Sequence, residues 1–138
     1  MKYFTEEEFL GWYDEMDHRL LQMLDALREL LGCPLYLSKL EGAIGRHAGS
    51  SGTWHNIDKH GKVYAVDGGI PESVTYNQLY DACLAVGFTG IGLYSGWNSG
   101  RGFHVDTRTD RDSSNPAVWS GIYVKGKTSY GSIQKLLN

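Results

Sequence analysis

The chain has 138 residues, the size of a single domain, and its 41% hydrophobic and 21% charged residues are typical of a folded globular protein. Its net charge of −3 and the lack of a basic run argue against nucleic acid as the main partner. No apolar run approaches the roughly 20 residues needed to cross a bilayer, and the acidic start does not resemble a secretory signal. Two widely spaced cysteines exclude a disulfide scaffold and a Cys-based zinc module.

The N-terminal third predicts one long amphipathic helix. Thr5 and Glu8 have the spacing of a capping box, and apolar residues then recur at intervals of three and four as far as Leu31. Gly32 supplies a C-terminal stop. We therefore expect a helix that starts after Thr5 and ends before Gly32.

The rest of the chain predicts short strands and two further helices. Strands are expected over residues 35–40, 62–67, 90–94, 102–107 and 118–125, and a short helix over 130–137. A second capping box at Thr75 and Gln78 opens a helix that ends at Gly87. Between the first two strands, residues 41–61 are rich in glycine and lack periodicity, which in a compact domain is typical of a functional loop. This order favours one α+β domain over residues 1–138, with a small antiparallel sheet and flanking helices.

Two of the predicted strands place polar side chains where a metal ligand set would need them. Alternation along a strand puts Asp67 on the face of Ala65, and His104 on the face of Asp106. If the two strands are neighbours, Asp67 and His104 converge, and a histidine from the glycine-rich loop would complete a His/Asp/His set. Three protein ligands with an open fourth position are typical of a catalytic zinc ion. The alternative is an Asp–His hydrogen bond on a sheet surface.

These residues also lie in motifs that resemble a known family. Thr53-Trp-His55-Asn56-Ile-Asp58-Lys-His60-Gly-Lys-Val-Tyr-Ala65-Val-Asp67 is similar to the S-x-H-N-x-D-x-x-G-x-V-x-A-x-D segment of phage-encoded M15 peptidases. The segments GFTGIGLY at 87–94, GFHVDTR at 102–108 and AVW at 117–119 resemble the closing motif of that family. The resemblance covers residues 35–120 and implies the fold shared by D-Ala-D-Ala peptidases and the hedgehog signalling domain.

The resemblance implies a zinc site, position by position. His104 matches the second histidine ligand, and Asp67 matches the carboxylate ligand. The first histidine has two candidates: His60 has the spacing of the widespread form of the motif, and His55 that of the longer phage form. We prefer His55, because the surrounding N-x-D-x-x-G-x-V agrees with the longer form.

The resemblance also implies residues that act on a substrate. Arg46 lies where the family has an arginine that holds a substrate carboxylate or the scissile carbonyl region, and Trp97 is a candidate to line the groove. One position departs from the family: its general acid/base is replaced by Arg101, which cannot accept a proton. Asp106 and Asp58 are the remaining candidates for that role. Asp106 has a second interpretation, in which it supports a ligand histidine or pairs with Arg108.

The function implied is a zinc-dependent peptidase that hydrolyses peptidoglycan stem peptides at a D-amino-acid bond and is encoded by a phage or prophage. We expect such a protein to be made in the cytoplasm, and then to reach the cell wall by release or as part of a virion. The alternative is a non-catalytic virion or tail module with the same fold and a degenerate metal site, which Arg101 favours. A His-Asn metal nuclease is disfavoured by the acidic charge. The sequence leaves the oligomeric state open.

Overall fold

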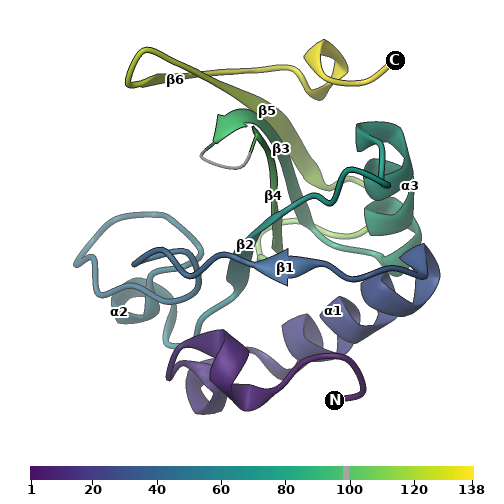
Figure 1. Ribbon diagram of the computed structural model, residues 1–138. Coiled ribbons are helices and arrows are strands. Elements are labelled where there is room, and N and C mark those ends of the chain that lie inside the picture. Colours follow the sequence, from purple (N-terminus) through teal and green to yellow (C-terminus); the bar gives the residue numbers. More distant parts are fainter. Residues whose placement is uncertain (98–99) are drawn as a thin grey trace.

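The computed structural model, which describes residues 1–97 and 100–138, has an α+β fold built around one six-stranded sheet (Figure 1). Across the sheet the strands are β1 (Tyr36–Leu37), β2 (Ala65–Gly69), β4 (Gly100–Asp106), β3 (Gly90–Trp97), β5 (Ala117–Val124) and β6 (Lys127–Gly131). All neighbouring strands are antiparallel except β3 and β5, which are parallel.

The expectation of a purely antiparallel sheet was therefore wrong at one pair of strands. β4 ends at Asp106, which pairs with Gly90 at the start of β3, and β5 begins at Ala117, which pairs with Gly90 from the other side. The second edge of β4 is occupied by β2, and β5 joins the sheet at the free edge of β3. The connection over residues 107–116 passes the end of β3, and β5 then runs in the same direction as β3.

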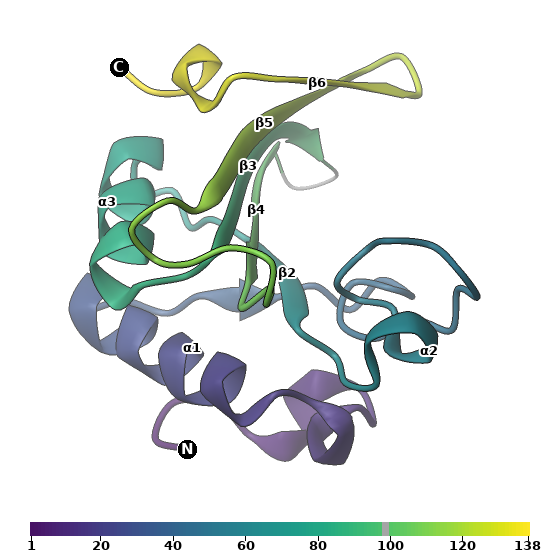
Figure 2. The ribbon, with the colours of Figure 1, turned by 180° about the vertical axis from the view of Figure 1, so that it is seen from behind.

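Two helices cover one face of this sheet. α1 (His18–Leu31) and α3 (Tyr76–Val86) pack against each other and against the sheet, and Figures 1 and 2 show both on the side opposite to the loop that contains α2 (Ile57–His60). The apolar side chains of the strands point toward these helices and form the core, for example Val66, Ile91, Leu93, Phe103 and Val105. The opposite face is left for polar side chains.

The N-terminal segment contains three helices rather than one. The capping box at Thr5 is present, but it opens a short 3-10 helix, η1 (Glu6–Phe9), which ends where Leu10 adopts a left-handed conformation with φ of 55°. A second 3-10 helix, η2 (Tyr13–Glu15), precedes α1. The predicted apolar spacing is real, because Phe9, Met16 and Leu20 are all buried. Several short helices that pack on one core satisfy that spacing as well as one long helix does.

The C-terminal segment also differs from the prediction. Residues 127–131 form β6, and only a 3-10 turn, η3 (Ile133–Lys135), follows. Val124 pairs with Lys127, so the β5–β6 hairpin has a two-residue loop, in which Lys125 and Gly126 both have positive φ, 52° and 81°. This is the pattern of a type I′ turn, whose twist matches that of the flanking strands. The turn makes this segment a hairpin strand, and the predicted helix does not form.

The remaining predicted elements are present with shifted bounds. The second capping box opens α3, and Gly87 ends it in a left-handed conformation. The first predicted strand is reduced to the two residues of β1, and the glycine-rich loop includes the single turn of α2. No helix within residues 1–97 and 100–138 is both long and apolar enough to cross a membrane.

Candidate metal centre

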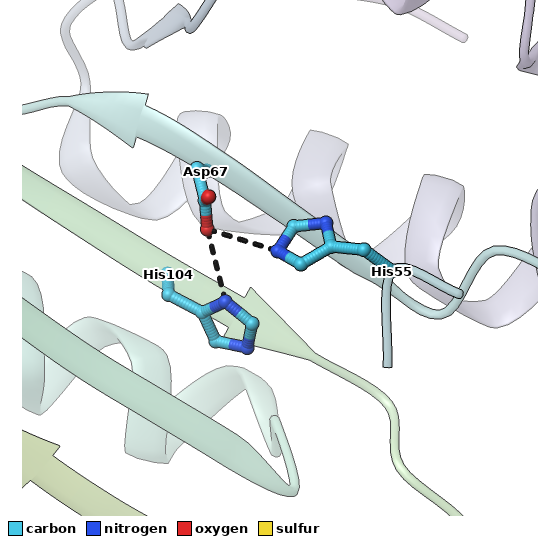
Figure 3. Close-up of side chains that lie close together, drawn as sticks. All are labelled: His55, Asp67 and His104. Atoms are coloured by element: carbon cyan, nitrogen blue, oxygen red, sulfur yellow. Dashed lines mark hydrogen bonds and ion pairs between the residues drawn. The ribbon is translucent and has the colours of Figure 1, made fainter. Parts of the chain in front are cut away.

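Asp67 and His104 meet because β2 and β4 are neighbours in the sheet. The two residues are direct cross-strand partners, and both side chains lie on the face that the helices do not cover. His104 Nδ1 lies 2.9 Å from Asp67 Oδ1 (Figure 3). The same alternation places Phe103 and Val105 in the core. β4 therefore contributes apolar side chains to one face of the sheet and His104 to the other.

His55 reaches the same aspartate from the glycine-rich loop. Its Nε2 lies 3.2 Å from Asp67 Oδ1, and its side chain is almost completely buried (Figure 3). The neighbouring residue, Asn56, holds the loop in shape: its side chain accepts hydrogen bonds from Ala48 N and Asp58 N and donates to the carbonyl of Ser51. Asn56 is also the N-cap of α2, and the His55 ring itself is held by a hydrogen bond from Nδ1 to the carbonyl oxygen of Ile44.

His60, the alternative ligand, lies outside the cluster. Its ring stacks on Trp54 with centroids 3.8 Å apart, and its Nε2 lies 3.3 Å from the carbonyl oxygen of Gly52. The ligand atoms of His55, Asp67 and His104, by contrast, all lie within 4.8 Å of one another. These three residues could hold a metal ion.

The hydrogen bonds of the two histidines leave a lone pair of each directed at Asp67. His55 Nδ1 lies 2.7 Å from the carbonyl oxygen of Ile44, which can only accept, so Nδ1 carries the proton and Nε2 faces Asp67 without one in the neutral ring. His104 Nε2 lies 2.6 Å from Asp106 Oδ2, which leaves Nδ1 to face Asp67. Two nitrogen lone pairs and a carboxylate oxygen therefore point at one another, and this arrangement is stable only with positive charge between them.

That charge is supplied either by protons or by a metal ion. Tetrahedral zinc, with bonds of about 2.0–2.1 Å to nitrogen and oxygen, separates its ligand atoms by roughly 3.3 Å. The contacts of 2.9 Å and 3.2 Å from the histidine nitrogens to Asp67 are close to this separation. The donor set of two imidazoles and one carboxylate is thus compatible with a divalent metal ion such as zinc, and two of its three ligand-atom separations are close to the tetrahedral value.

The pKa values of the metal-free chain show the same demand for positive charge. Burial alone would raise the pKa of the Asp67 carboxyl, but hydrogen bonds from His104 and His55 outweigh it and hold this pKa well below its usual range. Burial alone would lower the pKa of His104, but hydrogen bonds to Asp106 and Asp67 raise it to about 9. In the absence of a metal ion, His104 is therefore protonated at neutral pH.

Asp106, the first candidate for a general base, is fully occupied by other contacts. Its Oδ1 accepts from the backbone N–H and the Nε of Arg108, and its Oδ2 accepts from Arg108 Nη2 and His104 Nε2. Burial opposes its charge, but the bonds from Arg108 and His104 hold its pKa well below the usual range. The geometry corresponds to the second interpretation, in which Asp106 supports a ligand histidine and pairs with Arg108.

The other two positions considered for acid/base chemistry also lie away from the cluster. Asp58 is exposed and accepts from His47 Nδ1 at 2.8 Å. Arg101 stands three residues before His104 in β4, so it points to the opposite face of the sheet. There its guanidinium donates to the carbonyls of Val74 and Pro71.

A cavity of about 490 Å³ opens beside Asp67. Arg46 and Trp97, the two predicted substrate contacts, both line it. The Nε of Arg46 donates to the carbonyl of Gly42, while Trp97 stacks on Tyr94 with ring centroids 4.3 Å apart. The structure thus brings both residues to the same cavity as a predicted metal ligand. It also adds Glu41, which sequence reasoning missed because nothing in the glycine-rich loop distinguishes one acidic residue from another.

An aromatic wall made of Trp119 and Tyr94, two residues that the sequence offered both as groove candidates and as core packing, stands next to His104. The ring of Trp119 lies 5.0 Å from that of His104, and its Nε1 donates to the hydroxyl of Tyr94 at 2.7 Å. Trp119 can lie flat here because Gly92, between His104 and Trp119 in the sheet, has no side chain. The glycines at alternate positions of β3 are the sequence signal for this arrangement, because they leave room for a large aromatic ring on the neighbouring strand.

No family model, curated protein sequence or solved structure matches this chain.

Proposed function

We propose that the protein is a zinc-dependent peptidase that hydrolyses peptidoglycan stem peptides at a D-amino-acid bond, with the hedgehog/DD-peptidase fold. The observation that carries the proposal is the convergence of His55, Asp67 and His104, with two imidazole lone pairs directed at one carboxylate, beside a cavity that Arg46 lines. The resemblance of the surrounding motifs to phage-encoded M15 peptidases supports the substrate class. A phage or prophage origin, with action at the cell wall after release or from a virion, follows from the same resemblance.

The residues around the cluster have distinct tasks in this function. A zinc ion held by His55, Asp67 and His104 would act as a Lewis acid toward a carbonyl group and toward water. Arg46, with a planar guanidinium at the edge of the cavity, is suited to grip the carboxylate of a peptide terminus through two hydrogen bonds. Trp97 offers the cavity an apolar surface for the adjoining part of the peptide.

The first test is the zinc content of the purified protein, with His55→Ala and His60→Ala as a matched pair. We expect about one zinc ion per chain in the wild type and in His60→Ala, and a loss of zinc in His55→Ala, because His55 contacts Asp67 whereas His60 stacks on Trp54. Zinc-loaded protein is then incubated with a stem peptide that ends in D-Ala-D-Ala, and the products are identified by mass spectrometry. A wild-type protein that binds no zinc after reloading would contradict the proposal.

A second candidate function is a binding module that keeps the metal site but does not hydrolyse its ligand. Arg101 favours it, because the position of the family's acid/base residue carries a guanidinium that is bound to backbone carbonyls on the other face of the sheet. Zinc-loaded protein that binds the stem peptide in calorimetry and leaves it intact would establish this function instead.

A further inference from the structure

The proposed hydrolysis needs a group that takes up and returns a proton, and the cavity contains one candidate that the sequence did not single out. Among the residues that the structure describes, Asp67 and Glu41 are the two carboxylates that line the cavity. Asp67 is held by His55 and His104. Asp106 and Asp58, considered from sequence, are engaged elsewhere.

Backbone hydrogen bonds tie the turn that carries Glu41 to Asp67, and both residues line the same cavity. Glu41 is the second residue of a tight turn, in which Ala43 N donates to the carbonyl of Leu40 at 3.1 Å. The backbone of Asp67 holds both ends of this segment: Ser38 N donates to its carbonyl at 3.0 Å, and its N–H donates to the carbonyl of Ala43 at 2.9 Å. The turn that carries Glu41 is therefore held at a fixed position along the strand that carries Asp67.

The carboxylate of Glu41 is available for a ligand. Its residue is exposed, and within the described chain its side chain makes no hydrogen bond and no ion pair. Arg46 packs against the same turn through Gly42 and also lines the cavity, and a neighbouring depression holds His47 beside Glu41 and Arg46. The charged or titratable groups that line these two hollows together with Glu41 are Arg46, Asp67, Tyr123 and His47.

We propose that Glu41 is the general acid–base residue of the peptidase reaction; this inference rests on the proposed function. Its carboxylate takes a proton from the attacking water as the new C–O bond forms at the scissile carbonyl. It then gives that proton to the leaving nitrogen as the C–N bond breaks, so that Glu41 ends as it began. A positioned general acid–base group of this kind contributes about 10²–10⁴-fold to a rate.

The test compares Glu41→Gln, Glu41→Asp and the control Glu72→Gln, which changes an exposed glutamate outside the cavity. Zinc content and thermal unfolding are measured first, and all variants are expected to match the wild type. In cleavage of the D-Ala-D-Ala stem peptide, Glu41→Gln should lower kcat by about 100-fold or more, with little change in KM, and remove the acidic limb of the pH–rate profile. Glu41→Asp should keep part of the rate, and Glu72→Gln all of it.

A binding measurement provides a readout that does not depend on turnover. The probe is a phosphinate pseudodipeptide with two D-alanine-like side chains, titrated into zinc-loaded protein by calorimetry in two buffers of different ionisation enthalpy. A wild-type protein in which Glu41 acts as the base takes up about one proton per probe bound, because the carboxylate protonates against the phosphinate oxygen. Glu41→Gln should bind the probe more weakly and without that proton.

The outcomes separate this inference from the function on which it rests. Wild-type cleavage combined with full activity and an unchanged pH profile in Glu41→Gln would overturn the role of Glu41 and leave the peptidase in place. A raised KM at unchanged kcat would also overturn it, since Glu41 would then recognise a cationic group of the substrate. A zinc-loaded wild type that cleaves no stem peptide would overturn both.

Discussion

His104 is held between two carboxylates that have different tasks. Asp67 faces Nδ1 at 2.9 Å at the centre of the cluster, and Asp106 faces Nε2 at 2.6 Å from within the sheet. Because Asp106 also pairs with Arg108 through both oxygens, it stays ionised and fixes the proton of His104 on Nε2. Residues that orient a ligand histidine in this way raise the affinity of a metal site, and their loss typically costs about 10–100-fold in metal binding.

Replacing Asp106 with asparagine should therefore weaken zinc binding without removing a ligand. We expect the Kd for zinc to rise about 10–100-fold. The free energy of unfolding of the metal-free form should fall by about 3 kcal/mol, because the amide of Asp106→Asn leaves Arg108 without its anionic partner. Competition with a chelator measures the first effect, and urea unfolding the second. Asp110→Asn, an exposed change in the same connection, should alter neither, and an unchanged Kd in Asp106→Asn would contradict the role of that residue.

The sequence predicted the strand residues of the site but not its loop residues with equal certainty. Asp67 and His104 follow from strand alternation, which is a local rule. Spacing alone left both His55 and His60 open, because the contacts by which the side chain of Asn56 holds the loop cannot be read from spacing. The preference for His55 came from the resemblance of the surrounding motif. Glu41 reaches the cavity through backbone bonds to Asp67 from a turn that lies far from it in the sequence, so its place could not be read from spacing.

At the scale of elements, β3 and β5 make room for the aromatic wall. Gly92 lies between His104 and Trp119 across the sheet, and a Cβ at this position would meet the indole ring of Trp119. Because Gly92 has no side chain, Trp119 can lie beside His104 and donate a hydrogen bond to the hydroxyl of Tyr94. A glycine in the interior of a strand usually weakens the strand, and here it makes room for the aromatic wall.

Gly92→Ala should displace Trp119 and loosen this side of the site. We expect a loss of about 1–3 kcal/mol in the free energy of unfolding, as for other insertions into a packed region, together with a change in tryptophan fluorescence. Gly52→Ala is the matched control, because a Cβ there would meet only the far end of Lys59. Urea unfolding followed by fluorescence measures both variants, and a Gly92→Ala protein as stable as Gly52→Ala would show that Trp119 is not held in this position.

The errors in the predicted elements have a common physical origin. Caps and stops were predicted well, as the capping box at Thr75 and the left-handed Gly87 show, because they depend on residues a few positions apart. The extended segment between η2 and α1 pairs with a distant residue at the Met16–Val63 bridge, and the parallel pairing of β5 with β3 likewise depends on contacts between distant segments. A helical period of apolar residues does not distinguish one long helix from several short ones that pack on the same core.

In the molecule as a whole, the apolar core and the candidate site lie on opposite faces of the sheet. α1 and α3 cover one face of the sheet and bury the apolar side chains, while the candidate metal site, Arg108 and the aromatic wall lie on the other face. The metal-free chain therefore keeps its main core, and we expect it to fold without zinc. The charges of the cluster then add to or subtract from the free energy of unfolding, to an extent that depends on pH and on the presence of a metal ion.

This dependence has a definite sign. In the metal-free chain the folded-state pKa of His104 is about 9, above its ordinary value of 6.5, so its contribution to stability is fully present below about pH 6.5 and is lost as the pH rises through about 9. The pKa values of Asp67 and Asp106 are lowered in the folded state, so their contribution is present above about pH 3.8 and is lost in acid. The metal-free protein should thus be most stable between these two ranges.

Zinc should reverse the alkaline part of this curve. Zinc binds neutral imidazoles and competes with the proton on His104, so its stabilisation grows as the pH rises from about 6.5 to about 9. At a free zinc concentration of 100 times the Kd the gain is about 2.7 kcal/mol, or roughly 10 °C in Tm for a chain of this length. Thermal unfolding with zinc and with a chelator, across this pH range, should show the two Tm curves diverging as the pH increases. His60→Ala should give the same two curves, and a constant gap in the wild type would mean that His104 does not exchange a proton for the metal ion.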